Sequence, residues 1–182
     1  FSFFDYNVNE ALHTSSEEFE ILASFMRRIK QELEGNRDGM QDAIIVDYIS
    51  LLLNYCKRFY ERQFLTRKIA NADTLQRFHA VLEAYYTQEN PFQSGLPTVA
   101  YCADQLCMSA GYLGDLVRRH TGDTAINYIH RFILQKAKSL LSAGKTITEV
   151  AYDLGFAYPQ HLSRLFKKKE GPSPSEYVNG IR

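Results

Sequence analysis

The sequence lacks any run of about 18 apolar residues, so no segment is long enough to cross a bilayer as a helix. It also lacks the basic-then-apolar order of a secretory signal, and it does not begin with Met, so we expect a fragment of a longer protein. The cysteines and histidines are scattered without the spacing of a zinc, redox or nucleophilic site. We therefore expect a protein of the reducing cytoplasm that is not an enzyme, uses no cofactor or metal and contacts no membrane, with Cys56, Cys102 and Cys107 as small apolar packing residues.

The chain also has no net charge, since 21 basic residues balance 21 acidic ones, which is unusual for a protein that binds nucleic acid. The two signs are unevenly divided along the chain. Residues 1–90 carry 10 Lys or Arg against 14 Asp or Glu, and residues 91–182 carry 11 against 7. We expect the second half to attract phosphate and the first half to avoid it.

The most informative feature is a repeat between Val99 and Val178. Each copy has a short helical pattern, a tight break and a longer helix that ends in basic residues, which is typical of a helix-turn-helix unit. The matching positions are Ala103 with Ala151 and Leu106 with Leu154 at a shift of 48, then Leu113, Leu116, Gly122 and Tyr128 with Leu162, Leu165, Gly171 and Tyr177 at a shift of 49. Two units in tandem predict two adjacent reading heads on nucleic acid.

Capping residues predict where the helices of an all-α fold begin. Thr98, Ser109 and Thr124 suit N-caps, and two pairs, Ser15 with Glu18 and Thr146 with Glu149, suit capping boxes. These starts predict a first helix-turn-helix over about 98–120, a linker helix over about 125–143 and a second helix-turn-helix over about 147–170. A linker helix of about 28 Å is close to one turn of duplex, so the two heads could enter successive major grooves. The prolines and glycine of 89–97 predict a loop, and Pro172 and Pro174 are expected to break the chain after the last long helix.

A helical hairpin is predicted ahead of the repeat, followed by a linker or continued helix end at 66–73 and a helix from Thr74 to Gln88. Each helix of the hairpin carries an apolar seam: Phe19, Leu22, Met26, Ile29 and Leu33 in the first helix, and Ile45, Ile49, Leu52, Cys56 and Phe59 in the second. The second helix also carries apolar residues on another face, namely Ile44, Tyr48, Leu51 and Tyr55. Two helices alone cannot cover so many apolar sides. We therefore predict a homodimer through residues 15–64, or packing against a missing domain; a hairpin packed on the rest of the chain is the alternative.

The second helix of each unit is the expected DNA contact. The candidate residues are Pro159, Gln160, His161, Ser163, Arg164, Lys167 and Lys168 in the second unit, and Ser109, Gly111, Gly114, Asp115, Arg118 and Arg119 in the first. Gln can bind an adenine edge and Arg a guanine edge through two hydrogen bonds each, whereas the lysines at the helix end are expected to meet phosphate or solvent. The corresponding positions of the first unit are Ala110, Gly111, Gly114 and Asp115, where the glycines offer no side chain and Asp115 repels phosphate but could accept a hydrogen bond from a cytosine amino group. We therefore expect the first unit to contribute phosphate contacts from Arg118 and Arg119 and little direct reading of bases.

The segment ITEVAYDLGFAYPQHLSRLFKKKEGPSPSEY resembles the AraC/XylS family of bacterial transcription regulators, which show I-x-x-[IV]-A-x-x-x-G-F, a reading helix ending in F-K-K and G-x-S-P-x-x-[FY] here. The resemblance covers roughly residues 74–182 and implies a seven-helix domain that binds double-stranded DNA, with RNA polymerase as a further partner. It implies base-facing positions at Pro159, Gln160 and Arg164, and at Gly111, Gly114 and Asp115. It also implies that residues 1–65 are the tail of a cupin-type β-barrel effector domain, with FSFFDYNV as its last extended segment. A small-molecule effector would then act only through that absent barrel.

Two other functions remain open. The helix-turn-helix units could bind protein, or the chain could belong to DNA repair, because some alkyltransferases resemble this family in part. Repair would require a reactive, exposed cysteine in a basic setting, but Cys102 is expected to face inward and Cys107 to lie in a turn. Binding to duplex DNA that weakens steeply as salt rises would distinguish the regulator from both alternatives.

Overall fold

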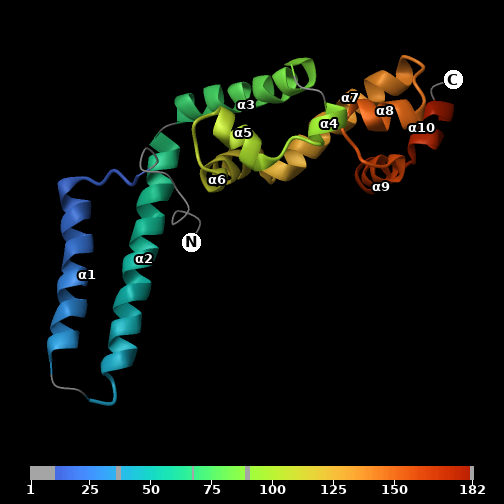
Figure 1. The fold of residues 1–182 in the computed structure, drawn as a ribbon. Coiled ribbons are helices and arrows are strands. Elements are labelled where there is room, and N and C mark those ends of the chain that lie inside the picture. The colour runs from blue at the N-terminus through green and yellow to red at the C-terminus, as the bar shows by residue number, and fades with distance from the viewer. Residues whose placement is uncertain (1–10, 36–37, 67, 89–90, 181–182) are drawn as a thin grey trace. The chain divides into compact units, whose positions relative to one another are not determined.

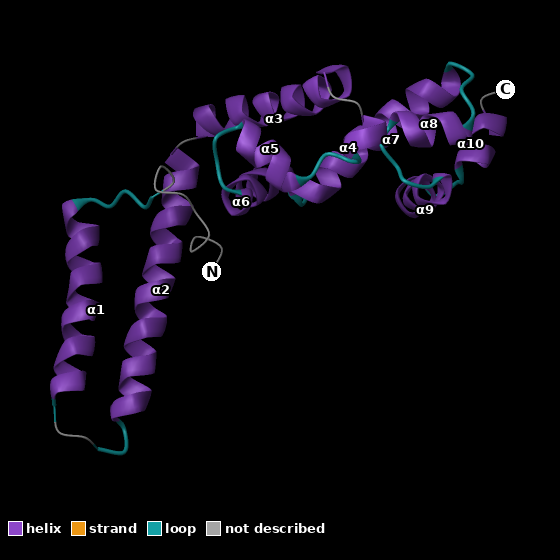
Figure 2. Cartoon of the chain, viewed as in Figure 1, coloured by secondary structure: helices purple, strands orange, loops and turns teal. Residues whose placement is uncertain are grey.

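The computed structural model describes residues 11–35, 38–66, 68–88 and 91–180, and the side chains of 64–72 and 88 are outside that description. The described residues form ten helices and no strand, which confirms the predicted all-α class (Figure 2). None of these helices combines the length and apolar character needed to span a membrane. The chain divides into two compact units, Phe1–Asn71 and Ala72–Arg182. The segment 1–8, expected to be the end of a barrel, lies outside the described residues.

The first unit is a helical hairpin of α1 (Ser16–Glu34) and α2 (Gln41–Thr66), which lie side by side and antiparallel (Figure 1). The predicted capping box is present, because the Ser15 hydroxyl accepts from the Glu18 N–H at 3.2 Å and the Glu18 carboxylate accepts from the Ser15 N–H at 2.9 Å. The same carboxylate forms an ion pair with Arg62 of α2 at 2.8 Å. The two helices are thus joined near the start of α1 by a charge pair as well as by apolar contact.

The seam predicted for α1 is only partly covered in the hairpin, since Leu22 and Ile29 are half-buried and its other three members are exposed. Phe19, Met26 and Leu33 are 59%, 57% and 66% exposed, whereas Phe25, which the seam omits, contacts the Tyr55 ring with centroids 5.3 Å apart. Periodicity identified an apolar stripe correctly but could not tell which neighbour it faces. Within this unit, as far as it is described, three apolar side chains spaced seven residues apart remain open to solvent.

The second unit holds the tandem repeat. Its helices are α3 (Lys68–Gln88), α4 (Pro91–Ser94), α5 (Val99–Gln105), α6 (Ala110–Thr121), α7 (Ala125–Ser142), α8 (Ile147–Asp153), α9 (Pro159–Glu170) and α10 (Pro174–Gly180) (Figure 1). The pairs α5–α6 and α8–α9 are the two helix-turn-helix units, and α7 connects them. The equivalent residues of the repeat are scaffold, because Ala103, Leu113, Ala151 and Leu162 are all buried in one apolar core that α3 and α7 complete.

Every predicted N-cap in this unit is observed. Thr98, Ser109, Thr124 and Thr146 each accept a hydrogen bond from the N–H three residues on, at 3.1–3.3 Å. The linker helix ends at Ser142, one residue before the predicted end, and the chain turns at Gly144 with φ of +93°. Local capping chemistry therefore fixed the boundaries of both units.

Three boundary predictions around these units are wrong. The expected loop 89–97 contains α4, because Pro91 has a backbone angle suited to a helix start and the Gly95 N–H closes the turn onto the Pro91 carbonyl at 2.8 Å. Helix α3 begins at Lys68 instead of Thr74, so most of 66–73 is helical, which agrees with the alternative of a continued helix end and not with a linker; no glycine or proline interrupts it. Pro174 does not break the chain but occupies the first position of α10.

Candidate nucleic-acid interface

Helix α9 presents an outward row of polar side chains. Leu162 and Phe166 are buried on its inner side, and the predicted contact residues Gln160, His161, Arg164, Lys167 and Lys168 are exposed. Pro159 is the first helical residue and is half-buried, and the half-buried Ser163 donates from its hydroxyl to the Pro159 carbonyl at 3.2 Å.

The chemistry of this row is suited to reading bases. Among the described residues, Gln160 and Arg164 have no hydrogen-bond or ion-pair partner, so their bidentate groups are available to a ligand. His161 differs, because its ring contacts the exposed Tyr158 ring edge-on with centroids 5.4 Å apart. The structure thus brings together on one helix all seven residues that the sequence predicted for the second head.

Helix α6 offers a different surface. Its inner side buries Leu113, Leu116 and Val117, and its last turn exposes Arg118 and Arg119. The remaining predicted residues, Ser109, Gly111, Gly114 and Asp115, are half-buried. Ser109 already accepts the capping hydrogen bond from the Tyr112 N–H at 3.2 Å, so its hydroxyl is in part committed to the helix start.

Packing does not require a glycine at position 114. A Cβ atom added there would meet no atom within 4 Å, and a glycine inside a helix costs about 1 kcal/mol relative to alanine. At the repeat positions equivalent to Gln160 and Arg164 the first head has Gly111 and Asp115, and its Arg118 and Arg119 are equivalent to Lys167 and Lys168.

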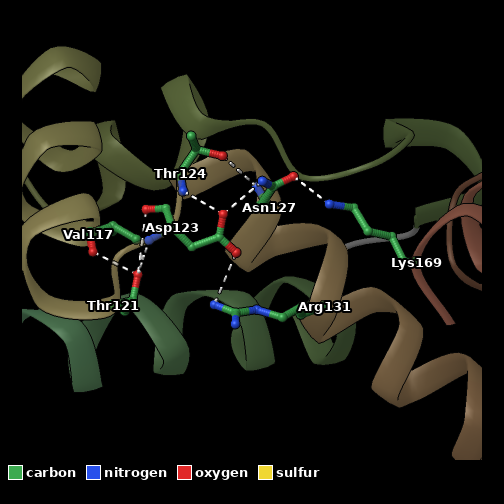
Figure 3. A network of polar contacts seen from close by, with 7 residues as sticks. All are labelled: Val117, Thr121, Asp123, Thr124, Asn127, Arg131 and Lys169. Carbon is green, nitrogen blue, oxygen red and sulfur yellow. Dashed lines mark hydrogen bonds and ion pairs between the residues drawn. The ribbon is translucent and has the colours of Figure 1, made fainter.

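The lysine run at the end of α9 is split by the structure. All three lysines are exposed, and the Lys169 ammonium alone among them donates a hydrogen bond to a described residue, Asn127, whose Oδ1 lies at 2.9 Å (Figure 3). Asn127 lies in the first turns of α7, 42 positions earlier in the chain. The sequence predicted Lys167 and Lys168 as contacts but gave no sign that Lys169 has a partner inside the protein.

Asn127 is itself part of a polar network between α6 and α7. Its amide donates to Asp123 Oδ1 at 2.7 Å, and the other Asp123 oxygen lies 3.5 Å from the Arg131 guanidinium (Figure 3). The hydrogen bond from Asn127 lowers the pKa of Asp123, and the Thr124 N–H, Arg131 and Lys169 act in the same direction. Asp123 therefore holds its negative charge between the two heads, where sequence reasoning had placed no functional residue.

His130 lies on α7 near the basic end of α9. Burial lowers the pKa of His130, and the positive charges of Lys169 and Lys168 lower it further. The imidazole is consequently kept neutral next to the lysine run.

A cavity of about 470 Å³ lies between α3, α7 and α8 and was not predicted from the sequence. Its charged groups already pair with one another or with neighbours: Lys136 with Glu83 at 2.7 Å, and Asp153 with Lys145 at 2.5 Å. The Lys136 ammonium also lies 5.2 Å from the centre of the Phe132 ring. These groups leave no unbalanced charge that would select a ligand.

Burial disfavours the thiolate form of two of the three cysteines. Cys102 is buried, and burial raises its pKa to about 11, which disfavours the reactive thiolate. Burial also raises the pKa of Cys56. Cys107 is exposed in the turn of the first helix-turn-helix, so the prediction that it is an apolar packing residue is wrong. Over the described part of the chain, no three His, Cys, Asp or Glu side chains are grouped so as to hold a metal ion.

Several known proteins are similar in sequence to parts of this chain. Residues 102–180 match a family model described as a helix-turn-helix domain. The HTH-type transcriptional activators RhaS of Salmonella heidelberg and of Salmonella typhimurium are each 29% identical to the chain over 157 residues, which covers 85% of this chain and 54% of each relative. The chain thus spans about half the length of the curated relatives it matches.

Two solved structures are also similar. The C-terminal domain of the two-component response regulator yesN from Fusobacterium nucleatum matches 59% of this chain and 98% of its own, with 27% identity and a TM-score of 0.49. The C-terminal domain of AraT, a response regulator from Geobacillus stearothermophilus, matches 57% of this chain and 84% of its own, with 24% identity and a TM-score of 0.48.

The tandem units and the matched family model agree that residues 102–180 form a helix-turn-helix domain. This match and the similarity to the RhaS activators support the resemblance to AraC/XylS regulators that the motifs of the second unit predicted.

Proposed function

We propose that this chain binds double-stranded DNA sequence-specifically through α6 and α9 and thereby regulates transcription. The observation that carries the proposal is the outward row of α9, where Gln160 and Arg164 are exposed and, among the described residues, have no partner. Both side chains can form the paired hydrogen bonds that distinguish one base pair from another in the major groove.

In this proposal the two helix-turn-helix units make different kinds of contact with DNA. Helix α9 reads bases through Gln160 and Arg164, while α6 anchors the protein on phosphates through Arg118 and Arg119. The 18 residues of α7 give a connector of about 27 Å, which is comparable to the rise of one duplex turn, about 34 Å. One chain can therefore contact two successive major grooves.

Substitution of Arg164 tests the assignment. On duplexes selected from a random library by the wild-type protein, Arg164→Ala should cost about 1–3 kcal/mol and relax the preference at one base pair. Lys168→Ala is the matched control, because it removes one positive charge from the same helix and should weaken binding about equally on selected and random duplexes. Absence of binding by the wild-type protein to any duplex at low salt would overturn the proposal.

We further propose that the hairpin forms a homodimer, as predicted for residues 15–64. The exposed Phe19, Met26 and Leu33 repeat every seven residues, which is the spacing of a helix–helix seam, and Val46 and Ile49 are exposed on α2. A second copy of the chain supplies an equal stripe by symmetry, as in an isologous interface.

Sedimentation of two charge variants tests the dimer. Met26→Glu should shift the protein to a monomer, whereas Gln31→Glu, which adds the same charge at an exposed polar position of α1, should leave the mass unchanged. A wild-type protein that remains monomeric at high concentration, or a dimer that survives Met26→Glu, would contradict the proposal and favour another partner for the stripe.

Other partners follow from the relatives. RhaS is described as a transcriptional activator, which supports RNA polymerase as a proposed partner of this protein in the cytoplasm. A small-molecule effector, where one acts, is proposed to bind a separate barrel domain. We propose no enzymatic activity, because the raised pKa of Cys102 weakens the DNA-repair alternative. Affinity for duplex DNA that does not fall as the salt concentration rises would favour a protein-interaction module.

A further inference from the structure

The last turn of α9 is tied to α7 at two points. The Lys169 ammonium donates to Asn127 Oδ1 at 2.9 Å, and the next residue, Glu170, forms an ion pair with Lys138 at 2.5 Å. Asn127 and Lys138 are separated by about 16 Å along α7, given the rise of a helix. Two adjacent residues of α9 therefore bind residues about three helical turns apart on α7.

The Asn127 end of this tie continues into the first head. The Asn127 amide donates to Asp123 Oδ1 at 2.7 Å, and the Asp123 N–H donates to the Thr121 hydroxyl at 3.2 Å. That hydroxyl donates in turn to the Val117 carbonyl of α6 at 2.8 Å (Figure 3). An unbroken chain of hydrogen bonds thus leads from the reading helix of one head to the reading helix of the other.

Asn127 is the necessary middle member of the chain. Its carbonyl oxygen accepts from a positive group, Lys169, and its amide nitrogen donates to a negative one, Asp123. Both hydrogen bonds are assisted by charge and fix the amide in one orientation. Removal of this neutral side chain breaks both bonds without changing the net charge of the protein.

We propose that Asn127 and Lys169 determine how strictly the protein requires its two DNA elements to lie a fixed distance apart. The apolar core places the heads on α7, and the polar chain restricts rotation of the second head relative to the first. Insertion of one base pair rotates the far element by about 34° and moves it by about 3.4 Å, so a restricted pair of heads discriminates spacing. This inference rests on the proposed function for its DNA consequence, and it assigns Lys169 a positioning role distinct from phosphate contact by Lys168.

A distance measurement without DNA tests the positioning role. Spin labels at Cys107 and at Ala157→Cys report the distance between the turns of the two helix-turn-helix units in the full chain, because both positions are exposed. Cys56 is changed to Ser so that it is not labelled, and Cys102 is kept because it is buried. We expect one narrow distance distribution in the wild-type background and in Gln135→Ala, a control at an exposed position of α7. Asn127→Ala and Lys169→Ala should broaden the distribution, and Lys169→Arg, which keeps a donor, should restore it.

Binding to spaced duplexes tests the consequence. On a duplex selected by the wild-type protein, insertion of one base pair between the two elements should weaken wild-type binding at least about fivefold, comparable to one wrong base pair. Asn127→Ala should bind the parent duplex more weakly but lose less than about twofold on insertion, a smaller penalty than a wrong base pair. Unchanged distances in Asn127→Ala, or equal insertion penalties in both proteins, would overturn the inference. A wild-type protein that binds no duplex overturns the proposed function, and the spacing role with it, whatever the distances show.

Discussion

Replacement of Gly155 by alanine should destabilise the second helix-turn-helix more than its backbone angle alone requires. Gly155 occupies the turn between α8 and α9 with φ of +87°, and a Cβ atom there would lie 2.3 Å from the Gly95 carbonyl oxygen and 2.9 Å from the Pro91 carbonyl oxygen. Because these are backbone atoms, the variant must move α4 or the turn. The matched control is Gly144→Ala, whose φ is +93° but whose Cβ atom would meet nothing within 4 Å.

The difference between the two variants isolates the close contact. Each alanine incurs about 1–2 kcal/mol for the left-handed angle and recovers about 0.4–1 kcal/mol through the unfolded chain. Only Gly155→Ala adds the cost of overpacking, about 1–3 kcal/mol. In urea unfolding followed by circular dichroism, with a slope of about 2 kcal/mol/M, its midpoint should fall about 0.5–1.5 M below that of Gly144→Ala. Equal midpoints would refute the close docking of α4 on this turn.

Three further predictions concern stability. Cys107 holds a φ of +56° in the turn equivalent to that of Gly155, so Cys107→Gly should stabilise the protein by up to about 1 kcal/mol in the same urea assay. Gly114→Ala should also stabilise, by about 1 kcal/mol, and a loss would show that the fold occupies the space beside this residue. The lowered pKa of His130 means that the unfolded chain binds more protons at low pH, so the free energy of unfolding should fall as the pH drops through about 6.5. His130→Gln should make that fall shallower in unfolding measured across this range, and an unchanged slope would contradict the assignment.

Helix starts were predictable from the sequence because their causes are local. Ser15, Thr98, Ser109, Thr124 and Thr146 each bind an N–H only three residues away, so a short stretch of sequence contains both partners. The same locality explains the failures. Pro91 and Pro174 were read as breakers, although proline also suits the first position of a helix, and only the surrounding contacts select between these uses.

The outward position of Gln160 and Arg164 was predictable from helical periodicity, because Leu162 and Phe166 fix the inner side of α9. The separate role of Lys169 was not predictable. The charge pattern does not distinguish three consecutive lysines from one another. The partner of Lys169, Asn127, lies 42 positions away in the sequence, and no periodic spacing relates the two residues. Whether the α1 stripe faces α2 was equally undecidable, because several apolar sides of one helix look alike in sequence.

The difference between the two heads explains why the polar connection between α6 and α9 would matter for specificity. A head that offers mainly Arg118 and Arg119 binds weakly and with little sequence preference on its own. When such a head is joined to a stronger one, its encounter with DNA becomes intramolecular, and the gain depends on how closely the connection matches the spacing of the two elements. A flexible connection would allow the first helix-turn-helix to bind phosphates at many spacings of the two DNA elements. It would then add affinity but would not discriminate between those spacings. Because phosphate contacts carry no sequence information, α6 can contribute to specificity only through its fixed position relative to α9, and Asn127 and Lys169 connect these two helices.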